Sequence, residues 1–465
     1  MFTLRLADLK KSWKQDITSG FLIFLIALPL SLGIALGSSF PPMAGIFAAV
    51  LGGMVVSFVS GSNVIIAGPA AGLIVVIIHG VDTLGQGDPL AGYRLTLAAI
   101  VIAGVLQMCL GLFKAGKLSA YFPSSVVHGM MSAIGIIIMA KQAHTLFGAR
   151  PVAKDIFGII AEIPNSILHM NPEIAVIGFV SLLILILVPK INIGWVKKIP
   201  LAMVVVLVGI GFDKFFDLEH AHKYLINDQT YDLGPKFLVQ LPANFSSAIT
   251  SPDWSMVGSG AFWFVTVSIA LVAALESLLS ASAIQGLDPL KRKSNFDKDL
   301  VALGLATSLS GLIGGLPMIA EIVRSSANVN NGAKTMWANF FHGLFLLTFI
   351  VALPWLIQEI PLSSLAAILL MVGWRLASPK EFIKIYNIGP DQLVVFLTTV
   401  AFTLGVDLLV GVGMGIVVKI IIHLLRGLSP KMLFKDTIDL EHEGTNYVLK
   451  IHNAAIFWNL LKIKE

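Results

Sequence analysis

The chain has 465 residues, of which 56% are hydrophobic and 13% charged, with a formal net charge of +5. Soluble domains carry roughly a quarter charged residues, so the composition excludes an ordinary soluble protein and predicts an integral membrane protein. The single cysteine excludes an internal disulfide framework, and the small positive charge, spread over loops, favours membrane topology over nucleic-acid binding.

Apolar runs of about 20 residues, the length that crosses a bilayer as a helix, recur along the chain. Helices are expected because lipid cannot satisfy open backbone groups, and because the runs are too long and too evenly apolar for barrel strands. Before them, residues 1–16 carry four basic residues and Trp13, which predicts an amphipathic cytoplasmic N-terminus.

Two sets of spans are expected, which form a first repeat over residues 17–212 and a second repeat over residues 259–425. The first set lies near 17–37, 42–60, 64–82, 93–113, 124–144, 173–190 and 197–212. The second set lies near 261–284, 297–314, 317–331, 334–354, 361–376, 388–405 and 407–425. The polar segment 213–258 separates them as an extracytoplasmic loop, and residues 426–465 follow the last span.

The positions of the basic residues support this number and orientation of spans. With the N-terminus inside, the expected inner loops carry most of them: Lys114, Lys117, Lys190, Lys197, Lys198, Lys291, Arg292, Lys293, Lys298, Arg375, Lys380, Lys384, Arg426 and Lys431. The 213–258 loop is richer in acids than in lysines. Positive residues accumulate on the cytoplasmic side of membrane proteins, so both termini are predicted to be cytoplasmic.

The third span of each set is interrupted. Gly61 to Gly72 and Gly314 to Asn328 each combine a Gly-rich or β-branched extended segment with a proline, Pro69 or Pro317, and a short helix. Because each set has an odd number of spans, the two halves insert in opposite orientations. Paired interrupted spans in inverted halves point to a transporter binding site near the midplane.

Proline is favoured in the first helical turn, so we expect helices to begin behind Pro69 and Pro317 and to direct free N–H groups at an anion. Small residues such as Ala70 and Ala71 would let a ligand approach the backbone. In the second span the binding residues would include Ala320, Glu321, Ile322 and Arg324. Arg324 either forms an electropositive wall for the anion or pairs with Glu321 three residues earlier; both interpretations stay open.

Glu276 is another acid inside an apolar span, and Ser280 lies one helical turn further on the same face. Their oxygens could hold a hard cation such as sodium, or Glu276 could take a proton. For the serines, a helix-packing role is the competing interpretation. His79, His128, His144 and His342 show no metal-ligand spacing and are expected to pack or to lie at interfaces.

Several motifs resemble the sulfate permease (SulP) family of anion transporters and exchangers, including its bicarbonate-transporting bacterial branch. They are Asp16 to Gly20 with Ala27-Leu28-Pro29, Gly61 to Pro69, Leu275-Glu276-Ser277, and Arg324 to Asn328 with Gly332 to Thr335. The resemblance implies an all-α polytopic fold of about fourteen segments in two inverted seven-segment repeats, with half-helices in segments 3 and 10. It also implies core and gate domains, elevator-like movement, and a homodimer.

The chain departs from the family pattern in places. Leu30 stands where many members have Gln, so a polar contact to substrate is missing. Glu321 stands where many members have a small or hydroxyl residue, and an added acid weakens anion binding unless Arg324 or a proton neutralises it. Glu276 and Ser280 are similar to the sodium-holding acid and hydroxyl of the bicarbonate-transporting branch.

The resemblance also implies a cytoplasmic STAS domain, of which residues 426–465 would be a remnant. Tyr447 to Ile451 and Ala454 to Asn459 look like its opening strands. Some 40 residues cannot bury an independent core, so this segment is expected to form a strand hairpin or to be disordered.

The hypothesis is secondary active transport of a small inorganic anion, bicarbonate or sulfate, coupled to sodium or protons, in a bacterial inner membrane. The site residues would be Pro69, Ala70, Ala71, Ala320, Glu321, Ile322 and Arg324 for the anion, with Glu276, Ser280 and Glu321 for the coupled cation. Alternatives are a nucleobase–proton symporter of the same architecture and an anion channel or exchanger. An enzyme is not expected, because the sequence shows no nucleophile–base set, metal cluster or nucleotide loop.

Overall fold

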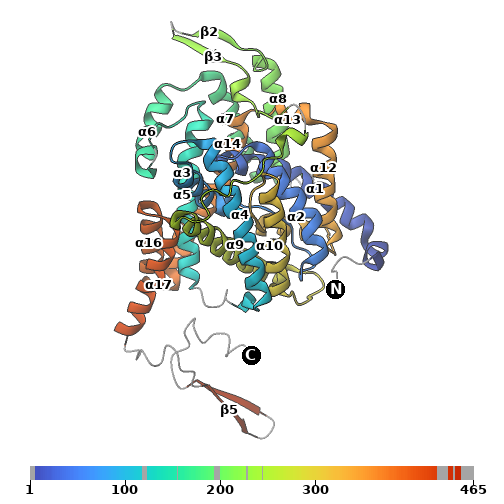
Figure 1. Cartoon of the computed structure of the whole chain (residues 1–465), viewed down its shortest axis with the longest axis vertical. Helices are drawn as coiled ribbons and strands as arrows, with labels where there is room; N and C mark the ends of the chain where they lie inside the picture. Colours follow the sequence, from blue (N-terminus) through green and yellow to red (C-terminus); the bar gives the residue numbers. More distant parts are fainter. Residues whose placement is uncertain are drawn as a thin grey trace. The chain divides into compact units, whose positions relative to one another are not determined.

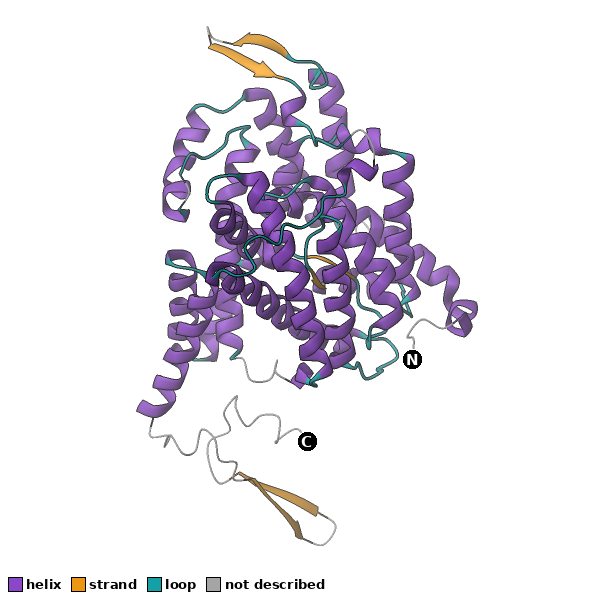
Figure 2. Cartoon of the chain, viewed as in Figure 1, coloured by secondary structure: helices purple, strands orange, loops and turns teal. Residues whose placement is uncertain are grey.

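The computed structural model describes residues 6–117, 123–153, 155–192, 199–226, 229–242, 245–426, 438–443 and 446–451. These residues form mainly helices, with three two-stranded sheets (Figures 1 and 2). Contacts divide the chain into two units. Unit 1 comprises Met1–Gly116 and Ile134–Arg375, and unit 2 comprises Lys117–Ala133 and Leu376–Glu465.

Unit 1 contains most of the helices, including the second half of α5. They are α1 (Leu6–Gly37), α2 (Pro42–Val59), α3 (Ile74–Gly85), α4 (Pro89–Leu112), α5 (Ser124–Leu146), α6 (Ile156–Leu168), α7 (Pro172–Leu187), α8 (Leu201–Phe216), α9 (Gly260–Leu287), α10 (Phe296–Leu312), α11 (Ile322–Asn330), α12 (Trp337–Ala352), α13 (Pro354–Gln358) and α14 (Leu362–Leu376). Short 3₁₀ turns η1 (Ala71–Leu73), η3 (Val188–Lys190), η5 (Pro235–Phe237) and η6 (Phe245–Ala248) connect some of them.

Unit 2 contains the first half of α5 with α15 (Pro379–Ile388), α16 (Pro390–Gly405) and α17 (Leu408–Leu425). Asp407 caps the start of α17 by accepting a hydrogen bond from the Val410 amide at 3.0 Å. The hairpin β5 (Ile438–Glu443) and β6 (Asn446–Ile451) follows. A hairpin was expected here and Tyr447 to Ile451 lie in β6, whereas residues 454–459 lie outside the described residues.

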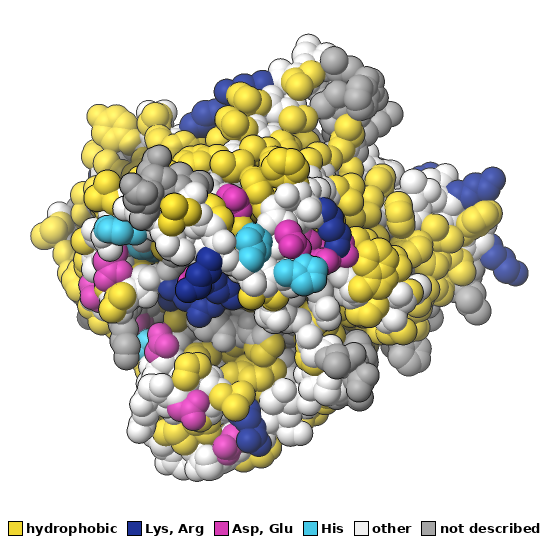
Figure 3. All heavy atoms as spheres, turned by 90° about the horizontal axis from the view of Figure 1, so that it is seen from above, with side chains coloured by type: hydrophobic (Ala, Val, Ile, Leu, Met, Phe, Trp, Pro, Cys, Tyr) yellow, Lys and Arg dark blue, Asp and Glu magenta, His cyan; other side chains and the backbone are white. Residues whose placement is uncertain are grey.

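Each of the fourteen expected spans coincides with a helix, or with a strand followed by a helix, to within a few residues, except that α1 begins eleven residues before the first span. Eight described helices are long and apolar enough to cross a membrane by length and composition. Three shorter helices, α6, α13 and α15, were not expected, because they are too short or too polar to register as spans. Hydrophobic side chains also cover much of the surface seen in Figure 3.

Two expected segments take more specific forms. The amphipathic segment 1–16 is not a separate helix from residue 6 onward, because α1 runs without a break from Leu6 to Gly37. The polar loop 213–258 contains a hairpin, β2 (His222–Ile226) paired with β3 (Gln229–Leu233).

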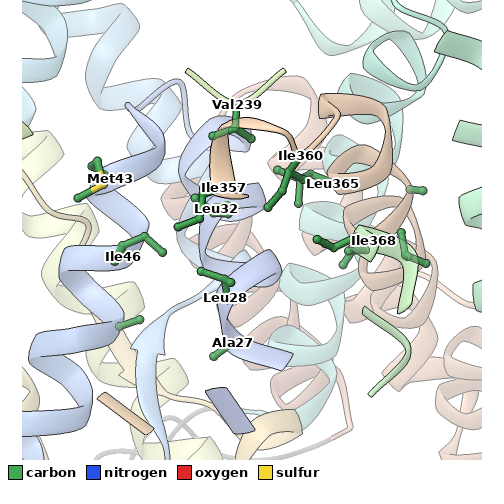
Figure 4. Close-up of a cluster of buried hydrophobic side chains, with 14 of the residues drawn as sticks. Ala27, Leu28, Leu32, Met43, Ile46, Val239, Ile357, Ile360, Leu365 and Ile368 are labelled. Carbon is green, nitrogen blue, oxygen red and sulfur yellow. The ribbon is translucent and has the colours of Figure 1, made fainter. Parts of the chain in front are cut away.

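A large hydrophobic cluster joins α1, α2 and α14 of unit 1. Leu28 and Leu32 from α1, Ile46 from α2 and Leu365 from α14 are each at most 2% exposed (Figure 4). Leu30, which replaces a polar residue of the family pattern, packs against this cluster as a partly buried residue. The cluster fixes α1, α2 and α14 around the interrupted spans.

The strands β1 (Ala67–Pro69) and β4 (Met318–Ala320) belong to the two interrupted spans and pair with each other among the helices (Figure 2). The pairing is antiparallel, with Gly68 opposite Ile319 at its centre. Each strand runs into a short helix, so the two helices begin at opposite ends of this small ribbon. The pairing places the two spans side by side in opposite directions, as expected for inverted halves.

One expectation about these spans is wrong. Pro317 does not begin a helix, because β4 follows it directly and α11 begins only at Ile322. Pro69 lies in β1, and the first helical turn starts at Ala71. The three-residue strands satisfy the backbone by pairing across the halves, which a proline-based rule for helix starts does not anticipate.

Candidate anion site

The candidate site surrounds the β1–β4 ribbon in unit 1. The register sets Pro69 opposite Met318 and Ala320 opposite Ala67, so Ala70 and Ala71 follow one end of the ribbon and Glu321 follows the other. Ala70 and Ala320 are 3% and 0% exposed, whereas Ile322 is 40% exposed. The expected substrate residues therefore lie at both ends of one short ribbon, and Ile322 is the exposed first residue of α11.

Arg324 reaches from α11 onto the first span. Its side chain is 1% exposed, and its Nη2 donates a long hydrogen bond of 3.4 Å to the carbonyl oxygen of Pro69. Its Nε and Nη1 have no hydrogen-bond partner among the described residues, although both are buried. A planar guanidinium with free donors is suited to a planar or tetrahedral oxyanion.

Glu321 and Arg324 form no ion pair with each other among the described residues, although their charges are close enough to interact. Glu321 is instead the N-cap residue of α11 and makes no side-chain cap hydrogen bond. Its amide donates to the Ile66 carbonyl at 2.8 Å. The two charges are therefore close enough to interact, without a direct ion pair between them in the described part of the chain.

Glu276 approaches the first span from α9. Its side chain is 6% exposed, and its Oε1 has no hydrogen-bond partner among the described residues. Ser280 is 8% exposed and follows by one turn of the same helix. The carboxylate is also close enough to Glu321 for the two acids to interact electrostatically. The structure thus gathers both acids and Arg324 around one ribbon.

Gly68 and Gly72 of the first span make room for these charged side chains. A Cβ at Gly68 would lie 2.5 Å from Nη1 of Arg324, and a Cβ at Gly72 would overlap the carboxylate of Glu276. Any larger residue at these two positions would displace a charge. Arg324 and Glu276 therefore flank the segment Pro69–Ala71 from positions four residues apart.

Polar side chains hold the backbone that leads into β1. Ser325 accepts a hydrogen bond from the Ile66 amide at 2.8 Å, and Asn328 donates to the Val64 carbonyl at 3.0 Å. Asn339 of α12 accepts from the Ala67 amide at 3.2 Å. Buried backbone groups in a membrane protein need such partners, so these residues position the site without forming it.

The second span is held in a similar way. Thr307 of α10 accepts from the Met318 amide at 3.2 Å, and Ser310 donates to the Leu316 carbonyl at 2.7 Å. Tyr93 of α4 donates to the carbonyl of Gly314 at 2.8 Å. Gly314 has a φ of 95°, which favours glycine at this turn.

Sequence reasoning missed the roles of Asn328, Asn339 and His342. Two of them are predictable in principle, because an extended segment inside a membrane requires side-chain hydrogen-bond partners and Asn is rare in apolar spans. His342 of α12 is fully buried and close enough to Arg324 to interact with its charge. Among the described residues, no group of three or more His, Cys, Asp or Glu could hold a metal.

Comparison with known proteins decides the family. A sequence profile described as "Sulfate permease family" matches residues 13–399. The chain belongs to the sulfate permease family. The family and the relatives found are transporters, so the chain is a transporter and not an enzyme, and its fold class is the expected all-α polytopic membrane protein.

Two relatives illustrate the distance within the sulfate permease family. YvdB of Bacillus subtilis (strain 168) is 26% identical over 90% of this chain and 74% of its own length. "Bicarbonate transporter BicA" of Picosynechococcus sp. (strain ATCC 27264 / PCC 7002 / PR-6) is 25% identical over 89% of this chain and 70% of its own length.

Two solved structures share the fold. "The transmembrane domain of a cyanobacterium bicarbonate transporter BicA" superposes with a TM-score of 0.70 and 22% identity, over 87% of this chain and 98% of that chain. "The overall structure of SLC26A9" gives a TM-score of 0.77 and 16% identity, over 95% of this chain and 69% of that chain. These likenesses support the multi-pass membrane architecture.

Proposed function

We propose that this protein moves a small inorganic anion, bicarbonate or sulfate, across the membrane by secondary active transport coupled to sodium or protons. The observation that carries the proposal is Arg324, whose guanidinium is buried with two nitrogens unpaired. A buried, uncompensated charge costs several kcal/mol. An anion bound at Nε and Nη1 would remove much of that cost.

The two helix starts add to the attraction. The η1–α3 segment begins at Ala71 and α11 begins at Ile322, at opposite ends of the β1–β4 ribbon. Each helix start offers about half a positive charge and unpaired N–H groups. An anion between them needs only charge and small size, which favours an inorganic oxyanion. The residues proposed to bind it are Pro69, Ala70, Ala71, Ala320, Glu321, Ile322 and Arg324.

Glu276 and Ser280 are the proposed cation residues. The unpaired carboxylate oxygen of Glu276 is a suitable ligand for a hard cation, and Ser280 follows on the same helix. A proton on Glu276 or Glu321 would serve the same purpose by removing the negative charge beside the anion. In both versions the cation favours anion binding, which is the basis of symport.

The remaining parts of the proposal concern movement and place. An elevator-like motion of a core domain against a gate domain would carry the site across a bacterial inner membrane. Both termini would be cytoplasmic, as the distribution of basic loop residues suggests, and the protein would work as a homodimer. BicA is named a bicarbonate transporter, and this name supports bicarbonate as the first substrate to test.

The test is uptake of radiolabelled bicarbonate, sulfate and uracil into proteoliposomes, with and without inward sodium or proton gradients. We expect gradient-driven uptake of one inorganic anion and none of uracil. Protein-free liposomes are the control. Uracil uptake without anion uptake would favour the nucleobase symporter. Anion flux that does not depend on a sodium or proton gradient would favour a channel or exchanger.

A further inference from the structure

A second electropositive region lies in unit 1, away from the β1–β4 ribbon. A cavity of about 880 Å³ opens among the ends of α1, α3 and α5 and the start of α14. Three cations line it, Lys141, Arg150 and Lys236, against one acid, Asp82. Lys and Arg side chains also gather on the face seen in Figure 3, beside Asp, Glu and His.

Two of these cations are unpaired. Among the described residues, neither the Lys141 ammonium nor the Arg150 guanidinium takes part in an ion pair or hydrogen bond, although Lys141 is close enough to Asp82 to interact with it. Lys236 makes a loose ion pair with Asp232 at 4.0 Å. Lys141 belongs to the membrane-spanning part of α5 and is half-buried. A charge at such a position usually has a functional reason.

Helix α3 runs from the candidate site to the cavity. Ile74, Ile78 and Asp82 follow each other at helical spacing, and the latter two line the cavity. Gly72, against which Glu276 lies, is about ten residues before Asp82, which corresponds to roughly 15 Å along a helix. Ile78 is only six residues after Gly72, so the near edge of the cavity lies roughly 9 Å from the candidate site along α3.

A hydrophobic contact lies in the wall of this cavity. A Cβ at Gly33 or at Gly37 of α1 would lie 3.2 Å from the side chain of Leu369 of α14. Gly33 and Gly37 are one turn apart, so Leu369 lies against a small-residue groove of α1. Leu369, Gly33 and Gly37 line the cavity as well, so this part of its wall is apolar.

We propose that this cavity is a hydrated vestibule that binds and concentrates small inorganic anions through Lys141, Arg150 and Lys236. It is far larger than the ~30 Å³ that one water takes, so an anion there keeps its water and is held mainly by charge. Clefts lined by one sign of charge raise the local concentration of the opposite ion. The claim that anions pass from the vestibule to Arg324 rests on the proposed function. The claim that the vestibule binds anions does not.

The test uses the single native cysteine of the chain. In a Cys109→Ser background, Thr145→Cys places a reporter thiol in the cavity wall. The purified full chain is labelled with methanethiosulfonates of similar size that carry a sulfonate or a trimethylammonium group. We expect the sulfonate to react about 10-fold faster relative to a free thiol, and this preference to fall as salt rises from ~0.01 to ~0.5 M.

Matched variants show which cations cause the preference for the sulfonate reagent. Lys141→Gln and Arg150→Gln should each lower the preference several-fold, whereas Lys223→Gln, an exposed cation of β2 outside the cavity, should not. A reporter at Thr230→Cys on the exposed β3 strand should show little preference. Millimolar sodium sulfate or bicarbonate should slow labelling of the vestibule reporter more than sodium gluconate does.

Equal labelling by both reagents, or an unchanged preference in both Lys141→Gln and Arg150→Gln, would overturn the proposal. Arg150 is exposed, so Arg150→Gln remains informative if Lys141→Gln does not fold. Because labelling needs no transport, a failed uptake experiment with preserved charge selectivity would count against the proposed function alone. Uptake without charge-selective labelling would count against the vestibule alone.

Discussion

The two interrupted spans have the same architecture but different chemistry. The first, β1–η1–α3, contributes backbone and space: its helix begins without a charged residue, and Gly68 and Gly72 leave room for side chains from elsewhere. The second, β4–α11, contributes charge: Glu321 is the N-cap residue of α11 and Arg324 is buried in its first turn. The first span thus contributes backbone groups and space, and the second span contributes the charged side chains.

The largest effect is expected from removing the charge of the second span. Arg324→Ala should lower anion uptake by about 100-fold or more, because losing one partner of a buried charge interaction costs about 2–5 kcal/mol. Arg324→Lys should recover only part of it, since an ammonium lacks the planar fork of donors. Initial uptake rates in proteoliposomes measure both variants. Full activity of Arg324→Ala would show that the charge of the second span is not needed for transport.

The next effect concerns the space in the first span. Gly72→Ala should lower uptake by about 10-fold or more, because the new Cβ overlaps the carboxylate of Glu276 and a close-packed site has no room to relax. Gly286→Ala on α9 is the matched control, since nothing lies within 4 Å of its Cβ position. If the two alanine variants transport equally well, Gly72 is not needed as space for Glu276.

A third change tests the acid that faces the first span. Glu276→Gln keeps the size of the side chain and removes its charge, so uptake should lose its dependence on a sodium or proton gradient while anion binding remains. The measurement is the ratio of uptake with and without each gradient, which should fall to about 1. A variant that is still fully gradient-driven would leave Glu276 without a coupling role.

The smallest effect is expected from a residue that holds the backbone of the first span in place. Asn339→Ala should lower the melting temperature of the detergent-purified protein by several degrees, because the buried amide of Ala67 loses its acceptor at a cost of about 1–3 kcal/mol. Uptake should fall only a few-fold. Thr348→Ala on the exposed face of α12 is the control, and an equal shift in both variants would argue against a special role of Asn339.

Much of this fold was predictable from the sequence, because long apolar runs leave few options in a bilayer. The charges Glu276, Glu321 and Arg324 were found for the same reason: ionisable residues in such runs are rare. The helix start of the second span was not found, because Pro317 before a three-residue strand looks like a proline before a helix. The role of Gly68 and Gly72 was not predictable, since only the structure shows that Arg324 and Glu276 occupy the space beside them.

The most direct measurement is equilibrium binding of radiolabelled bicarbonate and sulfate to the purified protein, for the native chain, Arg324→Ala and Arg324→Lys. The account predicts saturable binding of one anion to the native chain, loss of that binding in Arg324→Ala and partial recovery in Arg324→Lys. Saturable binding of the same affinity in Arg324→Ala would show that the anion does not bind at the two interrupted spans through this guanidinium.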